Sequence, residues 1–100
     1  MKTKVVHLRK HNYDVYIGRT FAEFAESIFK NPFHIGKDGD RDEVLLKFIE
    51  YWYAPEQTDI RHLAAKVLYD KTLGCWCKPK SCHGDIIAGY VNWKTENMLF

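Results

Sequence analysis

Short apolar runs near the start and in the last third of the chain predict β-strands. Lys4 to Leu8 and Asp14 to Gly18 are short and rich in β-branched and aromatic residues, and Thr72 to Cys77 is a third such run. The connection between the first two runs is short, so we expect them to pair as an antiparallel hairpin. The third run follows a long helical stretch and can therefore lie parallel to one strand of this hairpin.

Four segments have apolar residues three and four positions apart, which predicts amphipathic helices. Several also carry end signals: Thr20 and Asp40 each precede a glutamate by three residues, as in a capping box. Asn31-Pro32 and Pro55 stop the first two helices. The predicted helices run from Thr20 to Phe29, from Asp40 to the residues before Pro55, from Thr58 to Leu68, and from about Cys82 to Trp93, while the tail from Lys94 to Phe100 has no clear assignment.

These elements predict an α/β fold with the order β-β-α-α-α-β-α and a three-stranded mixed sheet packed with helices. One hundred residues, of which 46% are hydrophobic and 28% charged, are typical of one globular domain, so we assign residues 1–100 to a single domain. Ligands of such sheets gather beyond the carboxyl ends of the strands. Two loops are expected to meet there, Gly18-Arg19 after the second strand and Cys77 to Cys82 after the third.

Composition narrows the classes of function. The net charge of +2 does not favour nucleic acid as a partner. No apolar run is long enough to span a membrane, and Met-Lys-Thr-Lys at the start is followed by no signal-peptide core. We therefore expect a cytoplasmic protein with no membrane partner. Thiols are reduced in that compartment, and the odd number of cysteines, three, also argues against a disulfide framework.

All three cysteines lie in one stretch, where Cys75, Cys77, Cys82 and His83 supply four ligands of the kind that zinc prefers. Their spacing, C-x-C-x4-C-H, differs from the paired C-x2-C knuckles of structural zinc sites. In addition, Cys82 and His83 are adjacent at a helix start, so their side chains cannot both easily reach one ion. Zinc is therefore kept as an alternative cofactor, and the cofactor is otherwise open.

The same stretch has the features of an anion site. A helix that starts at Ser81 or Cys82 offers free backbone N–H groups, and Gly84 allows a ligand to approach the backbone closely. Arg19 and Arg41 are the cations expected to complete a phosphate or carboxylate pocket. The alternative is that Ser81 only caps the helix and Gly84 only allows packing.

A reactive thiol is the third chemistry that this stretch could carry. A cysteine at a helix N-terminus has a lowered pKa, and Cys82 is the best placed of the three. Asp85 is a candidate general base, although an aspartate there more often favours the helix start. Cys82 and Asp85 are thus the catalytic candidates, and whether the protein is an enzyme stays open.

The assembled motifs resemble the domain-of-unknown-function family 4326 (DUF4326). The blocks that carry the resemblance are Val15-Tyr16-Ile17-Gly18-Arg19, Asn31-Pro32-Phe33 with Ile35-Gly36 and Arg41, Leu73-Gly74-Cys75-Trp76-Cys77 with Pro79, and Cys82-His83-Gly84-Asp85-Ile86. The family occurs in bacteria, archaea and phages and its role is unassigned. The resemblance implies one constellation of Arg19, Asn31, Arg41, Cys75, Cys77, Cys82, His83 and Asp85. One departure is the full helix expected between Arg19 and Asn31, where many members have a short link.

Three functions follow from these patterns. The first is binding of an anionic small molecule, phosphorylated or nucleotide-like, at the loop after the third strand. The second is a zinc-binding module. The third is a phage or mobile-element protein that acts in the host cytoplasm and binds a host protein through the helix from Phe21 to Phe29; a homodimer is also left open. The expected ligand-binding residues are Arg19, Asn31, Arg41, Cys75, Cys77, Ser81, Cys82, His83 and Gly84.

Overall fold

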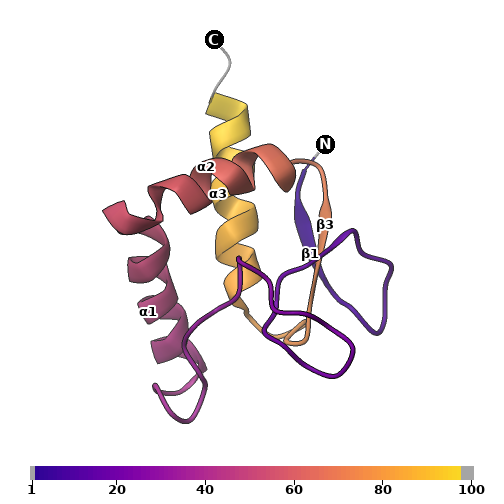
Figure 1. The fold of residues 1–100 in the computed structure, drawn as a ribbon, viewed down its shortest axis with the longest axis vertical. Coiled ribbons are helices and arrows are strands. Elements are labelled where there is room, and N and C mark those ends of the chain that lie inside the picture. Colours follow the sequence, from indigo (N-terminus) through magenta and orange to yellow (C-terminus); the bar gives the residue numbers. More distant parts are fainter. Residues whose placement is uncertain (1, 98–100) are drawn as a thin grey trace.

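Three parallel strands form the sheet, with β3 at its centre. β1 and β3 lie side by side in Figure 1. The computed structural model describes residues 2–97. It contains β1 (Lys4–His7), β2 (Val15–Tyr16) and β3 (Thr72–Cys75), in the spatial order β1-β3-β2. Both outer strands pair with β3 in parallel, Val5 and Val15 each facing Leu73. The α/β class is confirmed, but the prediction of a mixed sheet with a β1–β2 hairpin was wrong.

The hairpin prediction failed because β1 and β2 are not neighbours. β3 is an apolar strand with Leu73 and Cys75 buried, and such a strand is favoured at the centre of a sheet. The chain leaves β1 through the Leu8 N–H, which donates to Cys75 O at 3.1 Å, and returns where the Asp14 N–H donates to Thr72 O at 2.7 Å. The connection therefore crosses β3 in the opposite direction before β2 begins.

Gly74 allows this crossing. A Cβ at Gly74 would lie 2.8 Å from the Tyr13 ring and 3.2 Å from Leu8 Cβ, closer than real side chains approach. Leu8 and Tyr13, near the two ends of the connection, thus pack directly on the backbone of the central strand. The opposite side chains of β3, Leu73 and Cys75, point into the helical core.

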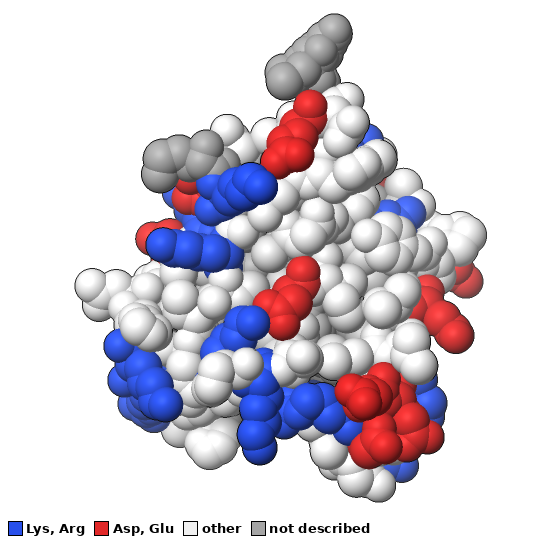
Figure 2. All heavy atoms as spheres, turned by 180° about the vertical axis from the view of Figure 1, so that it is seen from behind, with Lys and Arg blue, Asp and Glu red and all other residues white. Residues whose placement is uncertain are grey.

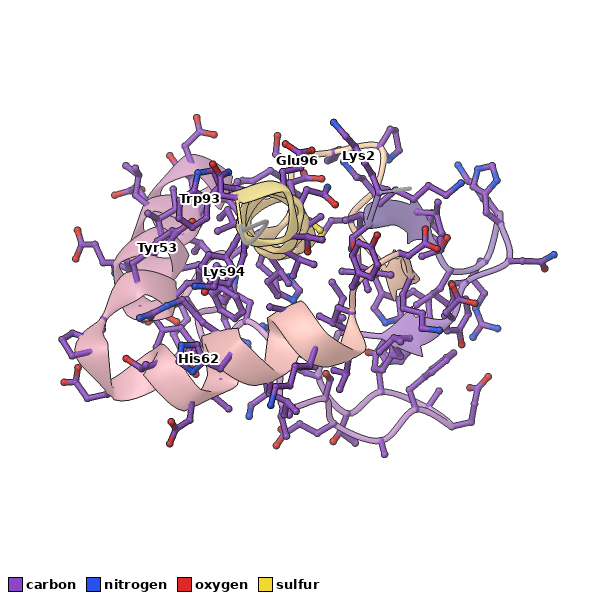
Figure 3. All side chains as sticks on the ribbon, turned by 90° about the horizontal axis from the view of Figure 1, so that it is seen from above. Lys2, Tyr53, His62, Trp93, Lys94 and Glu96 are labelled. Carbon is purple, nitrogen blue, oxygen red and sulfur yellow. The ribbon has the colours of Figure 1, made fainter. Side chains whose placement is uncertain are left out.

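The helices of the second half confirm most of the predicted ranges. They are α1 (Arg41–Tyr53), the short 3₁₀ helix η1 (Pro55–Gln57), α2 (Thr58–Val67) and α3 (His83–Asn97). The predicted capping box is present, with the Asp40 side chain accepting from Glu43 N. In Figure 3, α3 is seen end-on between α1 and the strands, and α2 runs across the lower part of the view, packed against α3. The buried core between these elements includes Phe48, Trp52, Leu68, Leu73, Ile87 and Val91.

The predicted helix from Thr20 to Phe29 is absent. Phe21 and Phe24 instead form a small antiparallel bridge around Ala22, whose φ of 50° is left-handed. The apolar residues of this segment do not share one face: Phe29 is buried in the core, whereas Ile28 is 56% exposed. The extra helix expected as a departure from the family pattern, and as a surface for a host protein, is therefore not formed.

Thr3 connects the start of β1 to the two helices behind the sheet. Its N–H donates to Asn92 Oδ1 at 2.8 Å, and its carbonyl accepts from Asn92 Nδ2 at 2.9 Å. Its hydroxyl donates to Leu68 O at 2.6 Å. The last predicted helix continues beyond Trp93 to Asn97, and the rest of the tail lies outside the described residues. Within residues 2–97, no helix is long and apolar enough to cross a membrane.

Candidate ligand pocket at the carboxyl edge of the sheet

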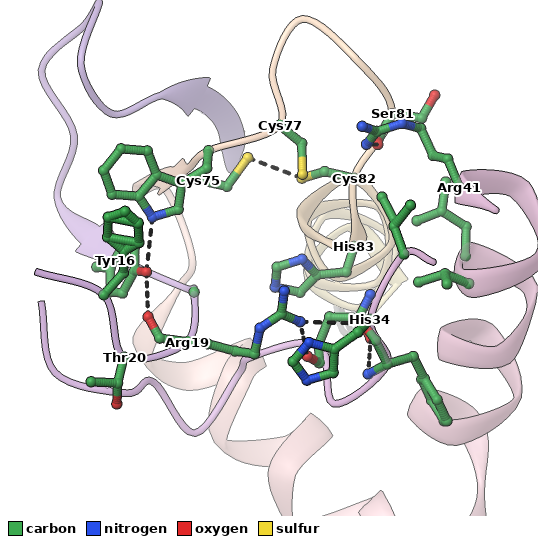
Figure 4. A pocket seen from close by; sticks show the side chains of 18 residues that line it. Tyr16, Arg19, Thr20, His34, Arg41, Cys75, Cys77, Ser81, Cys82 and His83 are labelled. Atoms are coloured by element: carbon green, nitrogen blue, oxygen red, sulfur yellow. Dashed lines mark hydrogen bonds between the residues drawn. The ribbon is translucent and has the colours of Figure 1, made fainter. Parts of the chain in front are cut away.

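A cavity of about 290 Å³ opens where β2 and β3 end and α3 begins (Figure 4). Its walls come from the loop after β2, the loop from Asn31 to Ile35, the start of α1 and the stretch from Cys75 to His83. The prediction that the loops after the second and third strands meet is therefore confirmed. All the expected ligand-binding residues except Gly84 line this cavity, namely Arg19, Asn31, Arg41, Cys75, Cys77, Ser81, Cys82 and His83.

Arg19 joins the end of β2 to the neighbouring loop. Its Nη1 donates to the carbonyls of Asn31 at 2.8 Å and Phe33 at 3.2 Å. The Asn31 side chain holds the same loop, since its Oδ1 accepts from Phe33 N at 2.9 Å. These bonds fix the guanidinium along the cavity wall (Figure 4). Arg19 is thus both a structural tie and a fixed positive charge.

Arg41 brings a second positive charge from another element. It is the first residue of α1, and its Nη1 donates to Ser81 O at 2.8 Å, which links α1 to the loop before α3. Among the described residues that line the cavity there is no aspartate or glutamate to neutralise the two guanidinium groups. The cavity is therefore electropositive.

Cys82, and not Ser81, occupies the position before the first residue of α3. Its sulfur accepts from Gly84 N at 3.2 Å, and Asp85 Oδ2 accepts in turn from Cys82 N at 3.1 Å. This reciprocal pair resembles a capping box, with sulfur in place of a hydroxyl oxygen. Asp85 also forms an ion pair with Lys78 at 2.7 Å and does not line the cavity. The structure thus gives Asp85 a helix-capping contact.

Gly84 lies behind the cavity wall. A Cβ at this position would lie 2.7 Å from Ile17 Cδ1 and 3.0 Å from Val5 Cγ1. The helix start therefore packs closely on the first two strands only because residue 84 has no side chain. The structure thus gives Gly84 a packing role, which was the alternative to close approach of a ligand.

The three thiols form one cluster beside Arg41. Cys75 and Cys82 are buried, with their Sγ atoms 3.1 Å apart, and Cys77 is half-buried on the cavity wall. Hydrogen bonds from Cys75 and Cys82, helped by the Arg41 guanidinium, hold the pKa of Cys77 far below its usual range. The hydrogen bonds with Cys75 and Cys77, together with burial, raise the pKa of Cys82. These contacts act on the pKa of Cys82 in the direction opposite to that expected from its place at the helix start, and they favour Cys77 as the thiolate.

His83 uses its ring to hold the strand end. Its Nε2 lies 2.8 Å from Ile17 O, and the Phe48 ring packs edge-on at 5.2 Å. Burial is the main cause that lowers the pKa of His83, so the ring is neutral near pH 7. The zinc set that was kept as an alternative is not assembled, because within residues 2–97 no three His, Cys, Asp or Glu side chains are arranged to hold a metal ion.

The other wall of the cavity is aromatic, and its contacts were not predicted. Trp76 Nε1 donates to Tyr16 Oη at 3.0 Å, and Tyr16 Oη donates to Arg19 O at 2.5 Å. The Phe21 ring lies 5.0 Å from Trp76. Tyr16 ends β2 just before Arg19, so its place next to the predicted loop was the available signal. The Phe21 contact depends on the turn around Ala22. This turn was not predicted, because the apolar spacing of the segment indicated a helix.

The fold and this cavity define a small parallel α/β domain with an electropositive pocket at the carboxyl edge of its sheet. Residues 2–93 match the family described as "Domain of unknown function (DUF4326)", and the chain belongs to that family. The resemblance drawn from its motifs is thus confirmed.

Two relatives are viral. An uncharacterised 12.4 kDa protein from the nrdA-td intergenic region of Enterobacteria phage T4 is 33% identical over 91 residues, which cover 89% of this chain and 77% of the phage protein. The uncharacterised protein R718 of Acanthamoeba polyphaga mimivirus is 37% identical over 70 residues, covering 66% of this chain and about half, 51%, of the viral protein. No solved structure matches the chain.

Proposed function

We propose that this domain binds a small phosphorylated or nucleotide-like molecule in the cavity between β2, β3 and α3. One observation carries the proposal: Arg19 and Arg41 both line the cavity, and no carboxylate among the described lining residues opposes them. Guanidinium groups bind phosphate oxygens through paired, charge-assisted hydrogen bonds. An anionic ligand would add negative charge beside these two guanidinium groups, of which Arg41 already has the Cys77 sulfur nearby.

The two guanidinium groups are held in place before any ligand arrives. Each uses its Nη1 on a backbone carbonyl, Arg19 on Asn31 and Arg41 on Ser81. A group that is already fixed loses less conformational entropy on binding. This arrangement favours a specific pocket over a loose patch of surface charge.

The volume of the cavity limits the ligand. About 290 Å³ lies at the lower end of the range for small-molecule sites, roughly 300 to 1,000 Å³. A phosphate, a sugar phosphate or part of a mononucleotide fits this volume, whereas a dinucleotide does not. On the rear face of the molecule, Lys and Arg side chains lie at the lower left and lower centre of the view, and an acidic cluster lies at the lower right (Figure 2).

Binding is tested by titration calorimetry with inorganic phosphate, pyrophosphate and nucleoside mono- and diphosphates at low salt. We expect saturable binding of at least one of these anions, at one site per chain. Loss of a charged hydrogen bond costs about 1.5 to 3 kcal/mol, so Arg41→Gln should weaken binding roughly tenfold or more. Arg19→Lys keeps the charge but loses the fork geometry, and should weaken binding less than Arg19→Gln.

Lys66→Gln is the matched control, because Lys66 is an exposed cation on α2 and does not line the cavity. It should leave binding unchanged. Circular dichroism and thermal melting of each variant report whether its fold is intact. The proposal fails if folded Arg41→Gln binds as tightly as Lys66→Gln, or if the unmodified protein binds none of these anions.

A further inference from the structure

One member of the thiol cluster, Cys77, is more accessible than the other two. Cys75 and Cys82 also line the cavity, but each is only 2% exposed, so little of their surface is open to a dissolved reagent. Cys77 is half-buried and lies on the wall of the open cavity. A reagent that enters the cavity therefore meets the sulfur of Cys77 first.

The two buried sulfurs are close enough to react with one another. Their separation of 3.1 Å is a contact between two free thiols, and it joins the end of β3 to the start of α3. Cys77 follows Cys75 by two residues, and Cys75 and Cys82 both lower its pKa, so the two buried thiols lie near the half-buried one. The three sulfurs thus form a continuous path from the cavity to the interior.

We propose that Cys77, Cys75 and Cys82 form a hydroperoxide-reactive thiol centre, in which Cys77 is oxidised first and the final product is a disulfide between Cys75 and Cys82. This inference goes beyond the proposed binding function and does not depend on it. The oxidant is a hydroperoxide small enough for the cavity, and hydrogen peroxide is the simplest one. The reductant that restores the thiols is a dithiol.

The chemistry takes three balanced steps. First, the Cys77 sulfur attacks the outer oxygen of ROOH, so that an S–O bond forms and the O–O bond breaks. The RO group takes up the proton that the Cys77 thiol has lost and leaves as ROH. Second, the Cys75 thiol attacks the Cys77 sulfenic acid; the S–S bond forms and water leaves. Third, the Cys82 thiol attacks Cys75 and releases Cys77 as a thiol. In sum, two thiols lose two electrons and two protons, and the peroxide becomes ROH and water.

The surroundings of Cys77 suit the first step. The thiolate is the reactive form of cysteine, and the thiols of Cys75 and Cys82 and the Arg41 guanidinium lower the pKa of Cys77. The buried thiols stay protonated until the sulfenic acid has formed. Arg41 acts here as a positioning residue, since it stabilises the thiolate without reacting.

The first test maps the product on the unmodified protein. After treatment with about one equivalent of hydrogen peroxide, intact mass should fall by two hydrogens, and thiol titration should find one thiol in place of three. The proposed disulfide joins tryptic peptides 72–80 and 81–94, and cleavage by chymotrypsin after Trp76 then separates Cys75 from Cys77. Dithiothreitol should restore the starting mass.

The second test asks whether Cys77 is the entry point. Cys77→Ser should slow disulfide formation by roughly tenfold or more, because the buried pair then has no exposed thiolate beside it. A substoichiometric amount of iodoacetamide, applied to the unmodified protein, should label the peptide with Cys77 before those with Cys75 and Cys82. This labelling needs no variant, so it holds even where Cys77→Ser fails to fold. The protein unfolded in guanidinium is the control, and it should show no preference among the three thiols.

Three results would overturn the proposal. One is that the protein keeps all three thiols at a peroxide concentration that oxidises a free cysteine. Another is that Cys77 goes directly to the sulfinic acid without a disulfide. The third is that folded Cys77→Ser oxidises as fast as the unmodified protein. None of these results depends on whether the cavity binds a phosphate.

Discussion

Each cysteine of the cluster differs from the others in what its sulfur contacts. Cys82 stands at the helix start, where the free N–H groups and the dipole of α3 favour a thiolate. Its sulfur is nevertheless buried against Cys75, and this contact keeps it protonated. Cys77 has the more exposed sulfur and the guanidinium of Arg41 beside it. A local helix signal was therefore outweighed by contacts made across the fold.

The protonation of His83 couples folding to pH. Burial lowers the pKa of His83 in the folded protein, so between that pKa and 6.5 the unfolded chain binds the proton more readily. The stability that neutral His83 contributes is complete above about pH 6.5 and falls as the pH drops below it. We expect urea denaturation to show a loss of up to about 1.4 kcal/mol per pH unit as the pH falls below about 6.5.

His83→Gln is the comparison for this pH effect. A glutamine can still donate to Ile17 O but cannot take up a proton, so this variant should have a flatter stability profile over the same range. Its absolute stability at pH 8 is expected to be lower, because the ring packing with Phe48 is lost. Equal slopes in the two proteins would show that His83 is not the titrating group.

The segment from Thr20 to Phe29 can be tested as an element. In a helix, an alanine-to-glycine change costs about 1 kcal/mol. At a left-handed position, glycine removes a steric cost of roughly 1 to 2 kcal/mol. Because Ala22 has a φ of 50°, we expect Ala22→Gly to raise the free energy of unfolding, by up to about 1 kcal/mol, measured by urea denaturation.

Ala25→Gly is the matched control, since Ala25 is an exposed alanine of the same segment whose φ is not positive. It should lower the stability slightly, through the greater entropy of the unfolded chain. If Ala22→Gly lowers the stability as Ala25→Gly does, the segment is not turned at Ala22 as described.

Elements with signals at their ends were predictable from the sequence. Examples are the capping box of Asp40, Pro55 after α1 and the apolar run of β3. Such local features favour their structure whatever the rest of the chain contacts. The spacing of Phe21, Phe24 and Phe29 is equally regular. The first two rings, however, pack against Trp76, whereas the Phe29 ring packs in the core. Periodicity predicts a helix only when one surface receives all the apolar side chains.

At the scale of the molecule, the place of the pocket was predictable although the strand pairing was not. The carboxyl ends of β2 and β3 meet because these two strands are parallel, and this pairing needs no contact between β1 and β2. The order β1-β3-β2 depends on a loop crossing the face of β3, and only the close approach of Tyr13 and Leu8 to Gly74 reveals it. A single glycine in a strand gives no such information by itself.

This crossing leads to a test of the topology. Gly74→Ala would place a methyl group 2.8 Å from the Tyr13 ring, and we expect it to lower the free energy of unfolding by about 1 to 3 kcal/mol. Gly89→Ala is the control, because nothing lies within 4 Å of a Cβ there and residue 89 is exposed on α3. Alanine at residue 89 should raise stability by roughly 0.5 to 1 kcal/mol.

Chemical denaturation of the two variants under the same conditions gives the comparison. A Gly74→Ala protein as stable as the unmodified one would mean that Tyr13 and Leu8 do not pack on the central strand. Loss of stability in Gly89→Ala would instead show that the surface of α3 is covered at that point.

The central place of β3 also governs when this chain can fold during its synthesis. β1 and β2 leave the ribosome early, yet the strand that both of them pair with is made only when residues 72–75 have been translated. The hydrogen bond from the Thr3 N–H forms later still, because its acceptor is the side chain of Asn92. The native sheet therefore cannot form before residues 72–75 have left the ribosome, however early β1 and β2 have done so.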